Sequence, residues 1–197
     1  MKKPTDLDPN ILVLNGSPQG GKSNCATMVK LIQKELKGKG KVQIAHLAET
    51  KYSALKKKII ASDAVLFVTG TYWDSWGSPL QKLLEEMTEL EGHPALMGKP
   101  CAVFVLMHSV GGKGILSRLQ GVLSTFGFMI PPMSGMVYSL AGDIALKKKG
   151  NSHASDFWHL DDISLILENV LRASRAKIEW VSWPVDKKNP ARKWIEI

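Results

Sequence analysis

Small and hydroxyl-bearing residues are concentrated in one short stretch near the start of the chain, Asn15-Gly16-Ser17-Pro18-Gln19-Gly20-Gly21-Lys22-Ser23-Asn24. It follows an apolar run and precedes residues with helical spacing, so it would join a strand to the N-terminus of a helix. Backbone N–H groups, hydroxyls and the positive end of a helix together can bind a phosphate. This composition favours an anion site over a plain turn with an N-cap serine.

Two different phosphate chemistries fit this loop. Residues 16–23 satisfy the P-loop pattern G-x-x-x-x-G-K-S/T of nucleoside triphosphatases. Such an enzyme also needs an aspartate at the end of another apolar strand to help hold Mg²⁺. The two candidate strands end in Thr69-Gly70 and Met107-His108, and Asp74 lies in an aromatic loop. The P-loop interpretation is therefore the weaker one, and the phosphate of a bound cofactor is the alternative.

Aromatic side chains follow the third apolar run, in the stretch Thr71-Tyr72-Trp73-Asp74-Ser75-Trp76-Gly77. Aromatic residues in a surface loop expose apolar area to water unless they cover something. A flat ring system could be covered in this way, whereas local packing or a subunit contact explains the loop alone equally well. A P-loop enzyme gives no reason for such a loop.

Glycines and one histidine follow the fourth apolar run, in the stretch His108-Ser109-Val110-Gly111-Gly112-Lys113-Gly114. Glycine lets a backbone approach a ligand closely. His108 could hydrogen-bond a ring or a substrate, and a purely structural role fits it equally well. The remaining histidines, His46, His93, His153 and His159, lack the spacing of metal ligands, so no metal site is expected.

A scaffold of alternating strands and helices would bring these three loops together. Apolar runs at 10–14, 41–47, 64–69, 100–107 and 128–138 alternate with segments of helical spacing. The apolar faces of these segments are marked by Cys25, Val29, Ile32 and Leu36, by Leu116, Leu119, Leu123 and Phe126, and by Ile163, Leu167 and Val170. The alternation predicts βαβ units with five parallel strands and about five helices. The loops after the first, third and fourth strands then lie at the carboxyl ends of the strands, where parallel sheets bind ligands.

Length and charge restrict the organisation of the chain and its partners. With 197 residues, the chain fits one domain, in which residues 181–197 lack helical period and form a tail that packs on that domain or on a partner subunit. The net charge of +8 comes almost entirely from scattered lysines, including Lys30, Lys34 and Lys37 on an outer helix face. No motif of a nucleic-acid-binding module accompanies them, so we expect no nucleic-acid partner.

The apolar runs and the cysteines indicate a cytoplasmic protein. The longest fully apolar run, residues 101–107, is too short to cross a membrane, and the N-terminus lacks the apolar core of a signal peptide. The two cysteines, Cys25 and Cys101, form no CxxC pair and fall on an apolar helix face and at the start of a buried strand. We expect both thiols to be inert and the protein to reside in the reducing cytoplasm without a membrane partner.

Taken in order, the three loops resemble those of the NADPH-dependent FMN reductase family. The resemblance covers about residues 10–138 and rests on Leu14-Asn15-Gly16-Ser17-Pro18-Gln19 with Ser23-Asn24, on Tyr72-Trp73 before Pro79-Leu80-Gln81-Lys82, and on Gly98-Lys99-Pro100 before Gly111-Gly112. The chain departs from the family pattern at Gln19, where many members carry Arg, at Gly70, where Pro is usual, and at Asp74, where Gly is common. Lys22 could replace the missing charge of that Arg.

The resemblance implies a fold and a chemistry. The fold is an α/β flavodoxin-like three-layer sandwich, with a five-stranded parallel sheet of order 2-1-3-4-5 and helices on both faces. The activity is an oxidoreductase in which bound FMN takes hydride from NAD(P)H and passes electrons to a small acceptor, namely flavin, a quinone, an azo or nitro compound, or a metal ion. No covalent catalytic residue is implied, because the cofactor carries the chemistry.

The resemblance also assigns residues and partners. Ser17, Gln19, Ser23 and Asn24 would hold the FMN phosphate. The ring would lie between Thr71, Tyr72, Trp73, Asp74 and Ser75 on one side and His108, Ser109, Gly111 and Gly112 on the other. One ring face would stay open to the nicotinamide. Members often form homodimers or homotetramers with the flavin near the subunit interface, so we expect such an oligomer here.

Other functions stay open on the sequence alone. An electron-carrier flavodoxin shares the fold, but such carriers are usually acidic, so the charge of +8 disfavours it. A P-loop nucleotide-binding enzyme and a basic nucleic-acid-binding module are weaker alternatives. If the positive charge has a role, we expect it to attract anionic FMN and NADPH.

Overall fold

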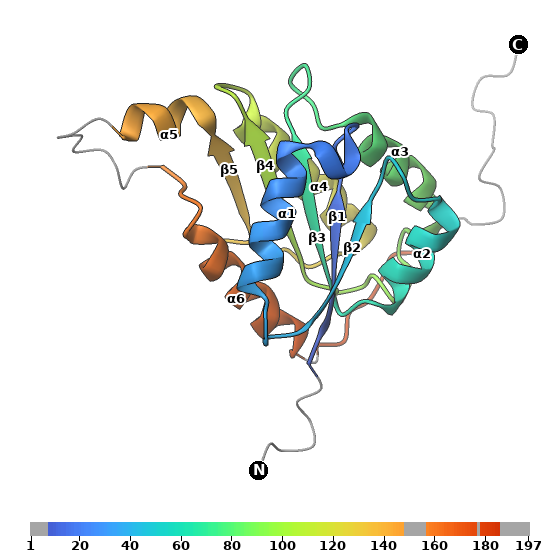
Figure 1. The fold of residues 1–197 in the computed structure, drawn as a ribbon. Coiled ribbons are helices and arrows are strands. Elements are labelled where there is room, and N and C mark those ends of the chain that lie inside the picture. The colour runs from blue at the N-terminus through green and yellow to red at the C-terminus, as the bar shows by residue number, and fades with distance from the viewer. Residues whose placement is uncertain (1–7, 148–156, 177, 186–197) are drawn as a thin grey trace, which may run out of the picture.

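Five parallel strands form the centre of the molecule in the computed structural model, which describes residues 8–147, 157–176 and 178–185 (Figure 1). The strands are β1 (Asn10–Asn15), β2 (Lys41–His46), β3 (Ala64–Gly70), β4 (Cys101–Met107) and β5 (Gly135–Ser139). Their order is β2-β1-β3-β4-β5, and every neighbouring pair is parallel. This is the predicted 2-1-3-4-5 order. Strand β2 lies on one side of β1 and β3 on the other, so the strand order reverses between β1 and β3.

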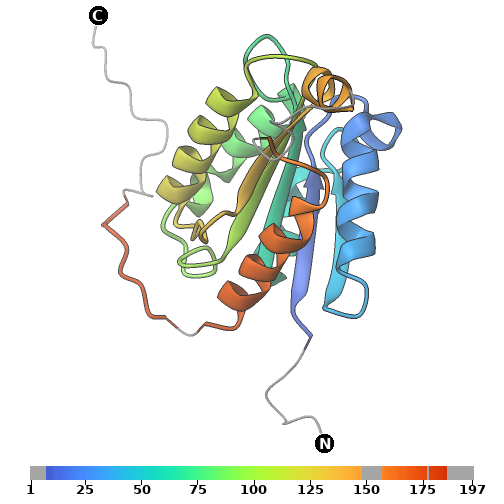
Figure 2. The ribbon, with the colours of Figure 1, turned by 90° about the vertical axis from the view of Figure 1, so that its left-hand side faces the viewer.

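Helices cover both faces of the sheet, which confirms the predicted three-layer sandwich (Figure 2). The helices are α1 (Asn24–Glu35), α2 (Tyr52–Ala61), α3 (Ser78–Glu86), α4 (Gly112–Phe126), α5 (Leu140–Leu146) and α6 (Asp162–Ser174), with 3-10 turns η1 (Gly20–Lys22) and η2 (Met87–Leu90). One core lies between the sheet and α1 with α6, and the other lies between the sheet and α2, α3 and α4. Alternate residues of β3 serve the two cores: Val65 and Phe67 face one, Leu66 and Val68 the other.

The apolar periodicity of the helices predicts their buried faces. Each apolar position marked on α1, α4 and α6 is buried, and Lys30, Lys34 and Lys37 are exposed as expected. At the start of α1, the Ser23 hydroxyl accepts a hydrogen bond from the Ala26 N–H (3.1 Å), the bond expected of an N-cap. The sequence thus fixes which side of α1 meets the sheet and where the helix begins.

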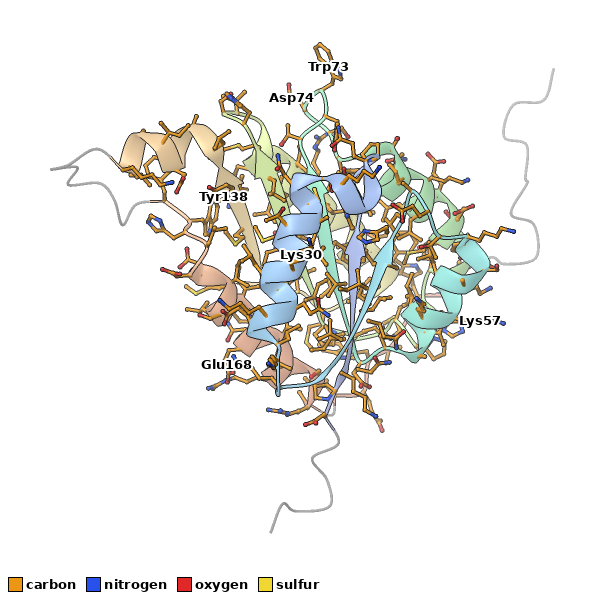
Figure 3. The ribbon with its side chains drawn as sticks, viewed as in Figure 1. Lys30, Lys57, Trp73, Asp74, Tyr138 and Glu168 are labelled. Atoms are coloured by element: carbon orange, nitrogen blue, oxygen red, sulfur yellow. The ribbon has the colours of Figure 1, made fainter. Side chains whose placement is uncertain are left out.

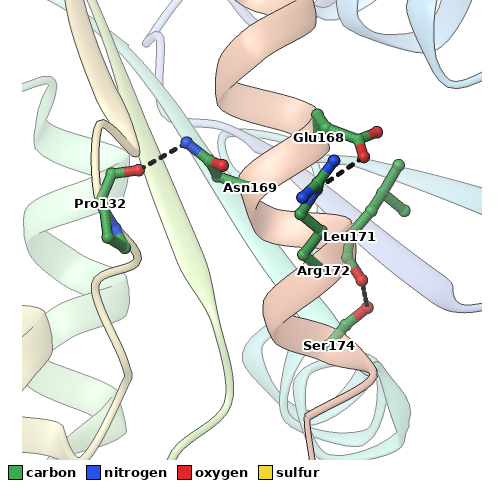
Figure 4. A network of polar contacts seen from close by, with 6 residues as sticks. All are labelled: Pro132, Glu168, Asn169, Leu171, Arg172 and Ser174. Atoms are coloured by element: carbon green, nitrogen blue, oxygen red, sulfur yellow. Dashed lines mark hydrogen bonds and ion pairs between the residues drawn. The ribbon is translucent and has the colours of Figure 1, made fainter.

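The fifth strand is shorter than the apolar run at 128–138 predicts. Met129 makes only an isolated bridge to Pro100, and regular pairing with β4 begins at Gly135. Between them lie Pro131 and Pro132, which lack the N–H that a strand ladder needs, and Met133 with φ of 55°. The detour is tied to α6, because the Asn169 amide donates to the Pro132 carbonyl (2.9 Å; Figure 4).

The Gly-Lys-Pro segment before β4 has a structural role. Lys99 is buried, and its ammonium group donates to the carbonyls of Ile59 and Ile60 at the C-terminal end of α2, the latter at 3.1 Å. Burial lowers the pKa of Lys99 to about 8, although Asp63 nearby opposes this shift. Lys99 therefore joins the C-terminal end of α2 to the start of β4.

The start of the predicted tail packs on its own domain. The Trp183 indole donates to Glu91 (3.2 Å), and Ser182 lies against Gly92. Just before the tail, the Trp180 indole lies against Gly98, where a Cβ atom would collide with it. Of the tail residues 181–197, only 181–185 lie within the described part of the chain. In the described residues, no helix combines the length and apolar character needed to span a bilayer.

Candidate cofactor site

The three loops converge at the carboxyl edge of the sheet, beside a cavity of about 480 Å³ next to α1. Some of the predicted site residues line this cavity, namely Ser17, Gln19, Ser23, Asn24, Thr71, Tyr72 and His108. Others lie outside its lining, namely Trp73, Asp74, Ser75, Ser109, Gly111 and Gly112. The cavity thus lies where the strand order reverses, the usual ligand position in an open parallel sheet.

The β1–α1 loop is shaped by a buried amide that the site prediction did not include. Asn15 ends β1 with no exposed surface. Its Oδ1 accepts from the Ser17 N–H (3.0 Å), and its Nδ2 donates to the Gly20 carbonyl (2.9 Å). The same Nδ2 lies 3.0 Å from His46 Nδ1 on the neighbouring strand β2. One side chain therefore fixes both halves of the loop, and an asparagine at the end of an apolar strand was its signal.

The hydroxyls of this loop form bonds within the protein. Ser17 is fully buried, accepts from the Gln19 N–H (3.2 Å) and lies 3.0 Å from the Tyr72 hydroxyl. Ser23 donates to the Gly20 carbonyl (2.8 Å) besides capping α1. The Ser17–Tyr72 bond joins the first loop to the second across the edge of the cavity.

The N-terminus of α1 supplies the donors for an anion. The first N–H groups of a helix have no acceptor inside the helix. The Ser23 hydroxyl takes that of Ala26, which leaves the N–H groups of Asn24 and Cys25, two residues that line the cavity. Lys22 is exposed and lies outside the lining, whereas the Glu49 carboxylate accepts from the Gly21 N–H (3.1 Å). The positive potential here thus comes mainly from the helix terminus.

The aromatic stretch forms a two-residue hairpin after β3. Tyr72 and Ser75 exchange hydrogen bonds of 2.8 and 3.0 Å, and the residues between them, Trp73 and Asp74, have φ of 49° and 56°. Such turns prefer glycine or asparagine, and other residues there cost of order 1 kcal/mol each. The hairpin directs Tyr72 to the cavity and Trp73 outward into solvent (Figure 3).

Residues of α4 and its preceding loop brace this hairpin. Arg118 donates to the Asp74 carbonyl, and its guanidinium lies 5.6 Å from the centroid of the Trp76 ring. Gly111 has φ of 88°, and a Cβ atom there would collide with Asp74 Oδ1. Gly112 packs against Val137 in the same close manner. The two glycines therefore serve close packing of the loops, which the sequence could not distinguish from closeness to a ligand.

The far wall of the cavity is apolar and was not predicted. It is formed by residues of α1, β5 and the chain beyond, namely Met28, Leu31, Tyr138, Leu140 and Leu160. The Tyr138 ring is half-buried, and burial together with nearby Asp143 raises the pKa of its hydroxyl. Helical spacing shows that Met28 faces inward without telling a core contact from a cavity wall, so no sequence signal marked these residues.

Besides its two tyrosines, the cavity is lined by two titratable residues, His108 and Cys25. His108 is exposed, and its carbonyl accepts from the Ala141 N–H (2.8 Å), which joins the third loop to α5. Burial raises the pKa of the Cys25 thiol to about 12, so it stays protonated at neutral pH. Burial also raises the pKa of Cys101. Both thiols have the inert character expected of them, and within the described residues no cluster of three or more metal-ligating side chains occurs.

Comparisons with known proteins agree with this geometry. The family model described as NADPH-dependent FMN reductase matches residues 9–141. No curated protein sequence matches the chain significantly. Among solved structures, RosB with a bound flavin-derived intermediate is 12% identical, with a TM-score of 0.66 and coverage of 95% of this chain and 96% of that one.

Two further structures show the same fold. A WrbA-like flavodoxin from Agrobacterium tumefaciens is 14% identical over 85% of this chain and 98% of that one, with a TM-score of 0.62. The apo form of an NADH:FMN oxidoreductase, EMOB, is 16% identical over 85% and 88%, with a TM-score of 0.60.

The site fits the cofactor of this family. A cavity next to a helix N-terminus offers donors for a phosphate, and Tyr72 and the apolar wall offer surfaces for a ring. Neither β3 nor β4 ends in a carboxylate, so the P-loop pattern at 16–23 is a coincidence of spacing. Because the family model matches well over half of the sequence, the chain belongs to the NADPH-dependent FMN reductase family, with FMN as cofactor and NAD(P)H as co-substrate.

Proposed function

We propose that this FMN-dependent reductase takes hydride from NAD(P)H and passes the electrons to a small acceptor: flavin, a quinone, an azo or nitro compound, or a metal ion. The observation that carries the proposal is the cavity at the reversal between β1 and β3, where loop donors and Tyr72 meet. When bound, the flavin supplies the redox chemistry. The chain itself binds the cofactor, orients it and leaves room for two successive partners.

The phosphate would be held at the start of α1. Ser17, Ser23, Asn24 and Gln19 line that end of the cavity, and the N–H groups of Asn24 and Cys25 add backbone donors. Hydrogen bonds to a charged phosphate are stronger than those between neutral groups. A phosphate would also compete for the Ser17 hydroxyl, which in its absence is bonded to Tyr72.

The ring would lie over the second and third loops. Thr71, Tyr72 and His108 line this part of the cavity, and His108 reaches it from the solvent side. The remaining predicted residues lie outside the lining, and we assign them to the rim of the entrance: Trp73, Asp74, Ser75, Ser109, Gly111 and Gly112. We assign no covalent role to Cys25, because burial raises the pKa of its thiol and keeps it protonated at neutral pH.

The assembly and compartment are part of the proposal. We expect a homodimer or homotetramer in a reducing cytoplasm, the compartment in which the unpaired thiols of Cys25 and Cys101 persist. Size-exclusion chromatography coupled to light scattering measures the oligomeric state directly.

Flavin titration is the first test. FMN added to the apoprotein should lose fluorescence as it binds, and the complex should oxidise NADPH when a quinone such as menadione is present. FMN binding without NADPH oxidation would indicate an electron carrier instead of a reductase. Mg²⁺-dependent ATP binding in place of FMN binding would overturn the proposal.

A double variant tests the phosphate assignment. Ser17→Ala with Asn24→Ala should raise the Kd for FMN by about tenfold or more, because each change removes a polar group next to a dianion. Ser53→Ala, an exposed serine in α2, serves as the matched control and should leave the Kd unchanged. An unaltered Kd in the double variant would refute the assignment while leaving the family membership intact.

A further inference from the structure

The tip of the hairpin after β3 carries an indole that is surrounded by water. Trp73 is 102% exposed, and its φ of 49° lies in the left-handed region that favours glycine. The next residue, Asp74, has φ of 56°. Strained residues of this kind cluster at functional sites, where the surrounding structure holds them. The exposed indole contributes nothing to the core, which points to a contact with another molecule.

Neighbours outside the hairpin contact both its backbone and the Asp74 side chain. Arg118 donates to the Asp74 carbonyl and also lies over the Trp76 ring. Gly111 packs directly against the Asp74 carboxylate. A side chain presented on a braced turn loses little conformational freedom on binding, so Trp73 is preorganised as an anchor.

The shape of the tip favours a protein over a small molecule. Small ligands bind in concave sites, whereas a protruding tryptophan is typical of a hot spot at a protein interface. Val110, on the next loop, is 72% exposed and adds a second apolar contact. Because Gly111 touches Asp74, the two loop tips stay side by side above the cavity.

The charge around these tips favours an acidic partner. In the three loops and the parts of the following helices within residues 15–24, 70–78 and 107–118, the charged side chains are Lys22, Lys113 and Arg118 against Asp74. With Glu49, which accepts from the Gly21 N–H, the local balance is three basic groups against two acidic ones. The whole chain carries +8, so its net charge also favours an acidic partner. Complementary charge accelerates and orients association with an acidic protein.

We propose that Trp73 and Val110 anchor a docking surface for a small acidic electron-carrier protein. The inference rests on the proposed function, because these two residues stand on the loops that border the cofactor cavity. A carrier seated on them would lie over the open mouth of that cavity. Its acidic surface would face Lys22, Lys113 and Arg118, and an apolar cleft would receive the indole.

Calorimetric titration with an acidic 2Fe–2S ferredoxin as the probe tests this surface on the FMN-loaded protein. We expect micromolar affinity at low ionic strength and a marked loss on going from about 0.02 M to about 0.3 M salt, because salt screens exposed charges. Basic cytochrome c, the probe of opposite charge, should not bind. Absence of ferredoxin binding at low salt would overturn the proposal.

Variants locate the contact. Trp73→Ala should weaken ferredoxin binding by about tenfold or more, as truncation of a hot spot does, and Val110→Ser by about threefold. Trp183→Ala and Val181→Ser are matched controls, since both residues are exposed but lie on the tail, where Trp183 donates to Glu91, and neither should change the Kd. Equal affinities for Trp73→Ala and Trp183→Ala would overturn the anchor.

Two further readouts separate docking from the cofactor chemistry and from self-association. The Kd for FMN and the NADPH oxidation rate of Val110→Ser should equal those of the parent, so a loss of ferredoxin binding in that variant isolates docking. Failure of the parent to bind FMN would refute the proposed function. The calorimetric titration with ferredoxin reports on the docking surface independently of that result. A dimer that dissociates on Trp73→Ala would assign the surface to a second copy and overturn the acidic partner.

Discussion

The β1–α1 loop and the hairpin after β3 border the same cavity, yet they are stabilised in opposite ways. The first loop has a buried base formed by Asn15, Ser17 and Ser23, and Asn15 hydrogen-bonds the loop from within. The hairpin has two strained residues and an exposed indole, and Arg118 and Gly111 hold it from outside. A loop that binds one fixed anion gains from internal bonds. A loop that meets different partners in turn needs a tip whose position is fixed but whose side chain is free to contact them.

Asn15→Ala should give the largest effect, because the change leaves the buried Ser17 N–H without its acceptor and removes one of the two donors to the Gly20 carbonyl. We expect a loss of about 2–4 kcal/mol in the free energy of unfolding, measured with urea, and weaker FMN binding. The control is Asn169→Ala, whose amide makes a single bond to Pro132 at the surface (Figure 4). Equal losses in both variants would contradict internal bracing of the first loop.

Gly111→Ala should lower the free energy of unfolding by about 1–3 kcal/mol, because alanine would be strained at φ of 88° and its Cβ would collide with Asp74. Gly114→Ala, in the first turn of α4, has open space around its Cβ and should instead stabilise by about 0.5–1 kcal/mol. Thermal unfolding of both variants gives the comparison. Shifts of the same sign would show that the hairpin is not braced from the third loop.

Asp74→Gly tests the strain in the hairpin itself. Glycine adopts φ of 56° without penalty, so the variant should gain about 0.5–1 kcal/mol in unfolding free energy, partly offset by greater freedom of the unfolded chain. Asp161→Gly, at the N-cap of α6 with φ of −68°, is the control and should lose stability. A clear loss in Asp74→Gly would mean that its carboxylate stabilises the turn more than its backbone strains it.

The smallest effect concerns Cys25 beneath the first loop. Its folded pKa of about 12 exceeds the usual 9, so its contribution to stability is fully present below pH 9 and is lost as pH rises from 9 to 12. At pH 8 the thiol should therefore react slowly with iodoacetamide in the native protein and rapidly in urea, as followed by mass spectrometry. Fast native labelling at pH 8 would show that the first loop opens more than its hydrogen bonds indicate.

Sequence patterns predicted the scaffold well because periodicity reports burial directly. The alternation of strands and helices and the faces of α1, α4 and α6 match these patterns, whereas the sheet order was implied by the family resemblance. The run at 128–138 was predicted too long, since hydrophobicity alone does not register that prolines interrupt a ladder. Helix α5 has only 7 residues, so its sequence shows too little helical period to predict it.

Side-chain direction is the part of the site that the sequence could not supply. The pattern placed Trp73 and Tyr72 in one aromatic wall, but adjacent residues in a hairpin point to opposite sides, and only Tyr72 lines the cavity. Asn15 bonds Ser17 and Gly20 in its own loop and lies next to His46 on another strand, and the sequence does not show which groups its side chain meets. The glycines at 111 and 112 mark close packing between elements, which local sequence cannot distinguish from ligand contact.

Helix α6 has a consequence for synthesis of the chain on the ribosome. Ile163, Ile166 and Leu167 of this helix cover part of the sheet face that α1 leaves bare, including Phe104 of β4 (Figure 2). A nascent chain that has emerged only as far as residue 141 holds all five strands and the three loops but lacks this cover. This apolar part of the sheet would stay exposed until α6 has emerged from the ribosome. We therefore expect chaperones to bind chains that are stalled at residue 141. This binding should disappear once residue 176 has emerged, because α6 then covers the sheet.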